Sequence, residues 1–248
     1  MRVLFISDLH LSAERPDKLA LFYRLLQHSA GNVDALYILG DLFEYWVGDD
    51  DNEAPHPDIV SALADFTASS SALCFMRGNR DFLIGEDFAA ATGSELLDDP
   101  TTIDIHGSPT LLLHGDLLCS KDLPYQELRR TVHNANWQEG VLSMTLSERR
   151  TLAEQMRVRS DNAKDAKDAY IMDVDENTVR QYMRDHGVLN LIHGHTHRPA
   201  VHEFVLDGTA ARRYVLNDWY DRDGVLVCDA GGWRQLRVEA YLKQVAET

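Results

Sequence analysis

The chain has 248 residues, 44% of them apolar, and a formal net charge of −16 at pH 7. This length and composition are typical of one globular domain with a sizeable core. The negative charge argues against general DNA or RNA binding, which needs a basic surface, but not against a site for divalent cations. Three scattered cysteines, a short apolar N-terminal run and no apolar stretch of about 18 residues argue against disulfides, a signal peptide and a transmembrane helix. We therefore expect a cytoplasmic protein.

Short apolar runs that end abruptly in polar clusters predict buried strands along the chain. The expected strands in the first part of the chain are residues 3–6, 35–39, 72–76, 111–113 and 189–192. The first three are separated by helical patterns, which also continue after the third, at 16–29, 57–69 and 81–91. This alternation predicts an α/β layered core. After about residue 199 we expect four more short strands with little helix between them, at 201–206, 213–216, 225–228 and 236–240.

Residues 121–170 differ from the rest, because they are predicted to be helical throughout. They hold nine Lys and Arg against eight Asp and Glu, a net charge of +1, which leaves −17 for the rest of the chain. A locally basic helical insertion in an acidic protein is a candidate cap over an anionic substrate. A solvated helical hairpin of mixed charge explains the same composition equally well. We call residues 121–170 the cap, and residues 1–120 and 171–248 the core.

Polar clusters follow five of the predicted strands. Because ligands of open α/β sheets bind at the carboxyl ends of strands, we expect side chains from distant parts of the chain to converge there. The candidate metal ligands are Asp8, His10, Asp41, Asn79, His114, His195 and His197. Two carboxylates, four imidazoles and one amide suit Mn, Fe or Zn better than Ca or Mg. Two ions that share a bridging carboxylate would use all seven and could clamp a phosphoryl group.

Each of these signals also has a structural interpretation. A lone histidine is commonly a hydrogen-bonded loop residue, which is our expectation for His28, His56, His106, His133, His186 and His202. An aspartate after a strand is commonly a helix N-cap, which is our expectation for Asp81, Asp116 and Asp122. Gly-Asp and Gly-Asn are common turn dipeptides, so one motif alone is a weak signal. Five motifs in series favour the metal site.

These motifs also carry a family resemblance. DLH at 8–10, GDLFE at 40–44, GNRD at 78–81, HGD at 114–116 and GHTH at 194–197 resemble the calcineurin-like metallophosphoesterases in order and spacing, over nearly the whole chain. The resemblance implies an α/β fold, a β-sandwich flanked by helices with the metal loops at one edge. It assigns one ion to Asp8, His10, Asp41 and His197. It assigns the other to Asp41, Asn79, His114 and His195, with Asp41 bridging.

Arg80 departs from the family pattern, because many members carry a histidine there that can protonate a leaving group. Arginine keeps its proton at any accessible pH, so it cannot act as a general acid. It can bind phosphate bidentately and stabilise developing charge. The substitution therefore favours a leaving group that departs without a proton, as a phosphate monoester does. This points to hydrolysis of a pyrophosphate bond.

Longer stretches narrow the resemblance. Residues 35–51, 78–82 and 191–203 are similar to the UDP-2,3-diacylglucosamine diphosphatases of lipid A assembly, as are 160–167 and 171–174. That family attacks the α-phosphorus of UDP-2,3-diacylglucosamine and releases UMP and 2,3-diacylglucosamine 1-phosphate. The resemblance implies substrate contacts from Asn79, Arg80, Asp122, Ser160, Lys164, Lys167 and His195. The expected catalytic residues are Asp41, which holds the attacking water with the ions, and Asn79, Arg80 and His195, which stabilise the phosphoryl oxygens.

The expected cofactors are two divalent ions, most simply Mn²⁺. The expected partners are the UDP-activated lipid and the cytoplasmic face of the inner membrane, bound peripherally, with no nucleic acid and no obligate protein partner.

Two other functions stay open. One is another metal-dependent phosphodiesterase or nucleotide pyrophosphatase of the same superfamily, which Arg80 and the cap disfavour. The other is a non-catalytic scaffold on this fold, which the complete ligand set disfavours.

The apolar residues of the cap have two interpretations. They could line a channel for acyl chains, or they could only pack the helices against each other and the core. The residues concerned are Leu128, Val132, Trp137, Val141, Leu142, Met144, Leu146, Leu152 and Met156. Residues 135–155 are less apolar and less basic than is common in the family. Together with the charge of −16, this argues against strong attachment to an anionic membrane.

Overall fold

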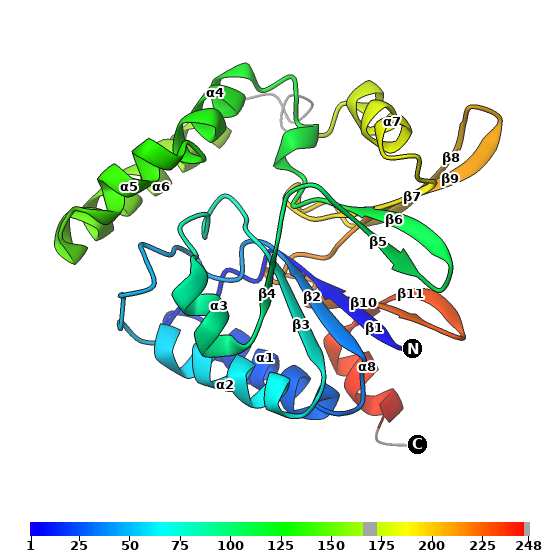
Figure 1. The fold of residues 1–248 in the computed structure, drawn as a ribbon, viewed down its shortest axis with the longest axis horizontal. Coiled ribbons are helices and arrows are strands. Elements are labelled where there is room, and N and C mark those ends of the chain that lie inside the picture. Colours follow the sequence, from blue (N-terminus) through cyan, green and yellow to red (C-terminus); the bar gives the residue numbers. More distant parts are fainter. Residues whose placement is uncertain (166–172, 246–248) are drawn as a thin grey trace.

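Two β-sheets pack face to face in the computed structural model (Figure 1). The structure describes residues 1–165 and 173–245, and for residues 159–165 and 245 it describes the backbone alone. The first sheet has the order β11 (Gly232–Arg237), β10 (Gly224–Asp229), β1 (Val3–Ile6), β2 (Ala35–Leu39), β3 (Ala72–Met76) and β4 (Glu95–Leu97). The second has the order β5 (Thr101–Ile105), β6 (Ser108–Leu112), β7 (Asn190–His193), β9 (Thr209–Val215) and β8 (Ala200–Leu206). The predicted α/β sandwich is confirmed.

The central strands are apolar on both faces because each face is covered. In β1, Leu4 and Ile6 belong to the apolar cluster beneath the helices, whereas Val3 and Phe5 belong to the cluster between the two sheets. This alternation follows from the two-residue period of a strand. It explains why the sequence shows continuous apolar runs rather than an alternating pattern.

Helices complete the layers. The outer face of the first sheet is covered by α1 (Pro16–Ser29), α2 (His56–Ala68), α3 (Glu86–Thr92) and α8 (Val238–Val245), as Figure 1 shows. Helix α1 buries Leu21, Phe22, Leu25 and Leu26, the spacing of one helix face. The second sheet is covered by α7 (Glu176–Asp185), through Val179 and Met183.

Parallel pairing brings the loops of the candidate site to shared edges. Strands β1, β2 and β3 are parallel neighbours in one sheet, and β6 and β7 are parallel neighbours in the other. The loops after these five strands carry the seven candidate ligands. Backbone hydrogen bonds continue beyond the strands, from Leu9 N to Asp41 O at 2.8 Å and from Gly194 N to His114 O at 2.8 Å. The loops are therefore fixed to one another as well as to their strands.

The cap contributes three helices, which project beside the sandwich in Figure 1: α4 (Leu123–Val132), α5 (Ala135–Leu142) and α6 (Leu146–Asp165). The short 3₁₀ helix η1 (Asp116–Leu118) precedes them. No strand occurs in the part of the cap that the structure describes, as predicted. Five of the nine apolar cap residues pack with the core cluster beneath the first sheet: Val132, Trp137, Val141, Leu152 and Met156. Leu128, Leu142 and Met144 are 40%, 44% and 41% exposed, so they are available to an apolar ligand.

Several predicted element boundaries were wrong. The strand expected at 236–240 ends at Arg237, and Val238 begins helix α8, whose buried Val238, Tyr241 and Leu242 have helical spacing. The helix expected at 81–91 begins only at Glu86, because residues 81–85 form a turn whose apolar side chains are buried in the hydrophobic cluster beneath the first sheet. Helix α7 and the short strands β4 and β5 were not predicted.

Among the described residues, no helix is both long and apolar enough to cross a membrane.

Candidate metal centre

Five of the candidate ligands have a left-handed backbone. Their φ angles are 55° at Asp8, 48° at His10, 54° at Asp41, 66° at His195 and 53° at His197. This conformation is uncommon outside glycine, although Asp and His adopt it more readily than most residues. Such residues cluster at functional sites, where the surrounding structure holds them in place. The loops are thus shaped to direct these side chains rather than to relax the backbone.

Two glycines let the backbone approach the carboxylates. A Cβ atom on Gly78, the residue before Asn79, would lie 2.2 Å from Oδ1 of Asp41. A Cβ atom on Gly194, the residue before His195, would lie 2.2 Å from Oδ2 of Asp8. Any side chain at either position would displace a candidate ligand.

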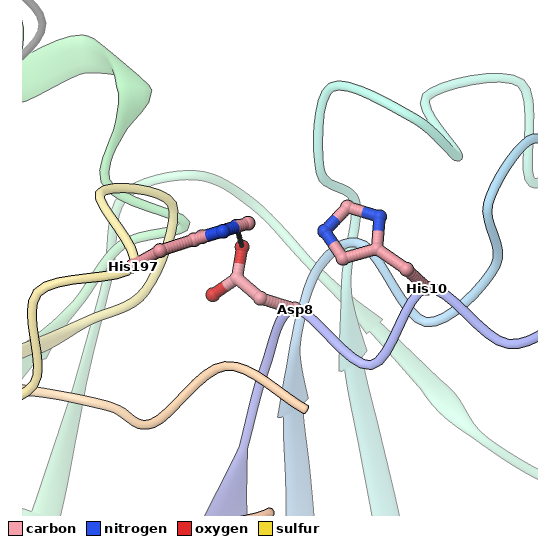
Figure 2. A group of neighbouring side chains, drawn as sticks. All are labelled: Asp8, His10 and His197. Carbon is pink, nitrogen blue, oxygen red and sulfur yellow. Dashed lines mark ion pairs between the residues drawn. The ribbon is translucent and has the colours of Figure 1, made fainter. Parts of the chain in front are cut away.

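Asp8, His10 and His197 form one cluster, shown in Figure 2, in which the ligand atoms lie within 4.8 Å of one another. His197 Nε2 lies 3.4 Å from Asp8 Oδ1. The other carboxylate oxygen, Oδ2, accepts hydrogen bonds from Ser7 Oγ at 2.6 Å and from the backbone N–H of His195 at 2.8 Å. Oδ1 is buried and has no hydrogen-bond partner among the described residues. A buried oxygen of this kind requires an explanation, and a cation supplies one.

A second group of donor atoms surrounds Asn79. Its Oδ1 lies 3.1 Å from His114 Nε2 and 2.8 Å from His195 Nδ1. His114 Nε2 is also 3.8 Å from Asp41 Oδ1. Neighbouring ligands around an ion with bonds of about 2.1 Å are separated by roughly 3 Å. These donor atoms therefore have the spacing of one coordination shell.

The tautomer of His114 is fixed by the backbone. Its Nδ1 lies 2.9 Å from the carbonyl oxygen of Leu39, which can only accept a hydrogen bond. Nδ1 must therefore carry the proton when the ring is neutral, and the lone pair of Nε2 faces Asn79 and Asp41. A backbone carbonyl behind the ring is the usual support of a metal-binding histidine.

The charges of the cluster also call for cations. Although burial favours its neutral form, the pKa of Asp8 is held well below its usual range by His197, and then by His114 and His10. Burial, and then the nearby Asp8 carboxylate, raise the pKa of Asp41. Against the effect of burial, the carboxylates of Asp41, Asp116 and Asp8 raise the pKa of His114 to about 9. The ligand atoms of Asp8 and Asp41 lie within 4.8 Å of one another. Two buried carboxylates this close need positive charge beside them, and the donor set fits divalent ions.

The GNRD motif braces Asp41. The backbone N–H of Arg80 donates to Asp41 Oδ1 at 2.8 Å. The Asp81 carboxylate accepts the N–H groups of Gly78 at 2.7 Å and Leu42 at 2.8 Å. The N-cap prediction for Asp81 was therefore wrong, because its side chain ties two loops together instead of capping a helix.

A contact between the cap and the centre was not predicted. Tyr125 and Arg129 of α4 donate to Oδ2 of the buried Asp116, from Oη at 2.7 Å and from Nε at 2.8 Å. The Tyr125 ring centroid lies 5.7 Å from that of His195. Asp116 therefore anchors the cap and is not an N-cap, whereas Asp122 does cap α4 by accepting the N–H of Tyr125, as predicted.

Tyr220 is a second residue that the sequence did not reveal. Its ring stacks on His10 with centroids 4.9 Å apart, and its hydroxyl donates to Glu44 Oε2 at 3.3 Å. No motif marks Tyr220, because it reaches the centre from the far end of the chain.

Three predicted substrate contacts lie outside what the structure describes: the side chains of Ser160 and Lys164, and the whole of Lys167.

Comparisons with known proteins agree with this geometry. The family model of the calcineurin-like phosphoesterases matches residues 1–199. The chain is 48% identical to a UDP-2,3-diacylglucosamine hydrolase of Aeromonas salmonicida over 235 residues, 94% of this chain and 92% of that protein. It is also 48% identical to a protein of the same name from Pseudomonas paraeruginosa, over 95% of this chain and 98% of that protein. A solved archaeal phosphodiesterase aligns with a TM-score of 0.51 at 12% identity, over 95% of this chain and 99% of that one, and supports the fold alone.

Proposed function

The chain belongs to the calcineurin-like phosphoesterase family, and we propose that it hydrolyses the pyrophosphate bond of UDP-2,3-diacylglucosamine, a step of lipid A biosynthesis. The products are UMP and 2,3-diacylglucosamine 1-phosphate. The observation that carries this proposal is the convergence of Asp8, Asp41 and four imidazoles at the strand ends of a chain whose relatives bear that name.

Two divalent ions fit the centre. We assign one to Asp8, His10, Asp41 and His197, and the other to Asp41, Asn79, His114 and His195. When bound, such ions supply the positive charge that polarises a phosphoryl group and makes water more acidic. The mixture of nitrogen and oxygen donors favours Mn²⁺ over Mg²⁺.

The protein's own residues prepare the reaction in three ways. The Arg80 backbone N–H holds the Asp41 carboxylate in one orientation, where it can orient the attacking water, and Asp81 holds the Asp41 backbone by accepting its N–H. The Asn79 amide and the guanidinium of Arg80 bind the phosphoryl oxygens. Since that guanidinium keeps its proton, the leaving phosphate departs without one from Arg80. This holds for either half of a pyrophosphate, and because the chain resembles the UDP-2,3-diacylglucosamine diphosphatases we place the attack at the α-phosphorus, so that the sugar phosphate is the leaving group.

The cap is proposed to hold the lipid half. Ser160, Lys164 and Lys167 would bind its phosphate and sugar together with Asp122, and the exposed Leu128, Leu142 and Met144 would contact acyl chains. A lipid substrate also implies that the protein works peripherally at the cytoplasmic face of the inner membrane. The exposed apolar residues of the cap support this location, because they offer an apolar surface to the bilayer.

One experiment tests the function directly. The metal-depleted protein is incubated with UDP-2,3-diacylglucosamine, with and without Mn²⁺, and UMP release is measured. We expect release only with the metal. Hydrolysis of dinucleoside polyphosphates or simple phosphodiesters in preference to this substrate would contradict the proposal and favour another activity of the superfamily.

A further inference from the structure

A cavity lies beside the metal centre. It has a volume of about 400 Å³ and is lined by Thr196, His197, Arg198, His202, Arg213 and Arg222, among others. This volume lies in the range of small-ligand sites. Its wall includes His197, which also belongs to the cluster with Asp8 and His10 (Figure 2). A ligand whose phosphate reaches the centre would therefore extend directly into this cavity.

We propose that this cavity binds the nucleotide half of the substrate, an inference that rests on the proposed function. The first reason is charge. Three arginines line the cavity in a chain of net charge −16, and the acidic wall residue Asp173 is ion-paired with Arg198. A cavity with an excess of arginine attracts an anionic, polar ligand.

The second reason is the support behind the wall. Arg213 is 8% exposed, and its Nη1 donates to Nε2 of the fully buried His193 at 3.0 Å. Nδ1 of His193 lies 2.8 Å from the carbonyl oxygen of Gly194, so this nitrogen carries the ring's proton and Nε2 accepts. The arginine is thus held in place by the strand that leads into the metal loop. A cation fixed in this way loses little conformational freedom when it binds an anion.

The third reason is an unused polar atom. The Thr196 hydroxyl is buried and has no hydrogen-bond partner among the described residues. Thr196 also lines the cavity. Buried hydroxyls are normally satisfied, and a ribose hydroxyl or a uracil carbonyl in the cavity would satisfy this one.

The geometry separates the two halves of the substrate. Loop 194–197 carries two candidate ligands, and α4 of the cap packs on one of them, since the Tyr125 ring lies 5.7 Å from that of His195. The cavity borders the other, His197. Because exposed leucines lie on the cap whereas arginines line the cavity, the acyl chains and the nucleotide are directed to different sides of this loop.

Calorimetric titration of the Mn²⁺-loaded protein with UMP tests the proposal. The double substitution Arg222→Ala with His202→Ala changes two exposed residues of the cavity wall. We expect it to raise the Kd for UMP about tenfold, since charge-assisted hydrogen bonds are lost. The matched control is Arg212→Ala, which removes the neighbouring arginine of β9, a residue that pairs with Glu203 and lies outside this cavity. It should leave the Kd unchanged.

Three outcomes would overturn the inference. One is an unchanged Kd for UMP in the double variant, and another is an equal loss of affinity for inorganic phosphate, which would make the cavity an anion site without nucleotide recognition. The third is weakened binding of 2,3-diacylglucosamine 1-phosphate in place of UMP. If the unmodified protein hydrolyses UDP-2,3-diacylglucosamine while any of these occurs, only the cavity assignment fails. If it does not hydrolyse this substrate at normal metal content, the proposed function fails instead.

Discussion

Arg149 of helix α6 is bound to Asp50 of the loop that follows the Asp41 motif. Its two terminal nitrogens donate to the two carboxylate oxygens at 2.7 and 2.5 Å, and Nη1 also donates to the carbonyl of Val47 at 2.7 Å. The side chain is only 4% exposed. A Cβ atom on Gly48, whose φ is +138°, would lie 2.2 Å from Nη1, so this loop accepts the arginine only because residue 48 is glycine. The cap is thereby fixed to the segment that carries a proposed bridging ligand.

Replacing Arg149 with Met should loosen the cap. Charge-assisted hydrogen bonds contribute about 1.5–3 kcal/mol, less here because Asp50 is largely exposed, so we expect Tm to fall by about 2–6 °C. The matched control is Arg130→Met, which removes an exposed arginine paired with Glu127 on α4 and should change Tm by less than about 1 °C. Equal melting of the Arg149→Met and unmodified proteins would show that this contact does not hold the cap.

Asp41→Ala should abolish metal binding and hydrolysis together, because one carboxylate is proposed to serve both ions. We expect activity to fall by more than about 100-fold, with metal content measured in parallel by elemental analysis. Asp104→Ala, which removes an exposed carboxylate of strand β5 that accepts the N–H of Gly107, is the control and should retain both properties. Near-normal turnover in Asp41→Ala would refute the dimetal assignment.

Hydrolysis in ¹⁸O-water should place the label in UMP. This follows from attack at the α-phosphorus, with departure of a phosphate that needs no proton from Arg80. Mass spectrometry of both products gives the answer. Label in the sugar phosphate would mean attack at the β-phosphorus with UMP as the leaving group, and would refute the proposed position of attack.

The contacts of Asp116 predict an order of destabilisation. Arg129 pairs with both Asp116 and Asp99, at 2.8 and 3.0 Å, so Arg129→Met would leave two buried carboxylates without their cation. We expect this to cost about 3–5 kcal/mol in urea unfolding. Tyr125→Phe removes one hydrogen bond, keeps the ring on His195 and should cost about 1–2 kcal/mol. The prediction fails if the two variants are equally stable.

His133 should make the protein sensitive to mild acid. Burial, and then the charge of Arg129, lower the pKa of His133 to about 4 from an ordinary value of 6.5. Below pH 6.5 the unfolded chain takes up a proton that the folded chain does not. Stability is therefore complete above pH 6.5 and declines as the pH falls towards 4, by about 1–2 kcal/mol after allowance for partial exposure.

Urea unfolding of the metal-free protein at pH 7.5 and 5 measures this effect without a contribution from metal release. His133→Gln should lose less stability between these two values than the unmodified protein. His186→Gln, which replaces an exposed histidine at the end of α7, should behave like the unmodified protein. The same acid sensitivity in His133→Gln would assign the effect to other groups.

The sequence predicted the ligand loops because each one follows a short apolar strand and carries its own motif. Parallel pairing then places strand ends together, so the convergence of Asp8, Asp41 and His114 needed no long-range knowledge. Helix α8 was missed because Leu236 to Ala240 also alternates like a strand, and only the packing of Tyr241 on α1 decides the matter. The partners of Asp116 and His10 could not be predicted, because no local pattern encodes a contact between residues on separate elements.

The left-handed backbone conformation of five candidate ligands has a further consequence for protein engineering. At Asp8, His10, Asp41, His195 and His197 a glycine would relax the backbone, by about 1 kcal/mol at each position. Glycine at Asp8 or Asp41 would also lose the hydrogen bonds that their carboxylates accept, so a search for thermostable variants that scores folding alone would favour replacing the partly exposed His197. Such a variant would have a higher melting temperature in the metal-free form and no hydrolytic activity when metal is added. Selection by melting temperature alone would thus run opposite to selection by turnover, and screens on this chain should measure both.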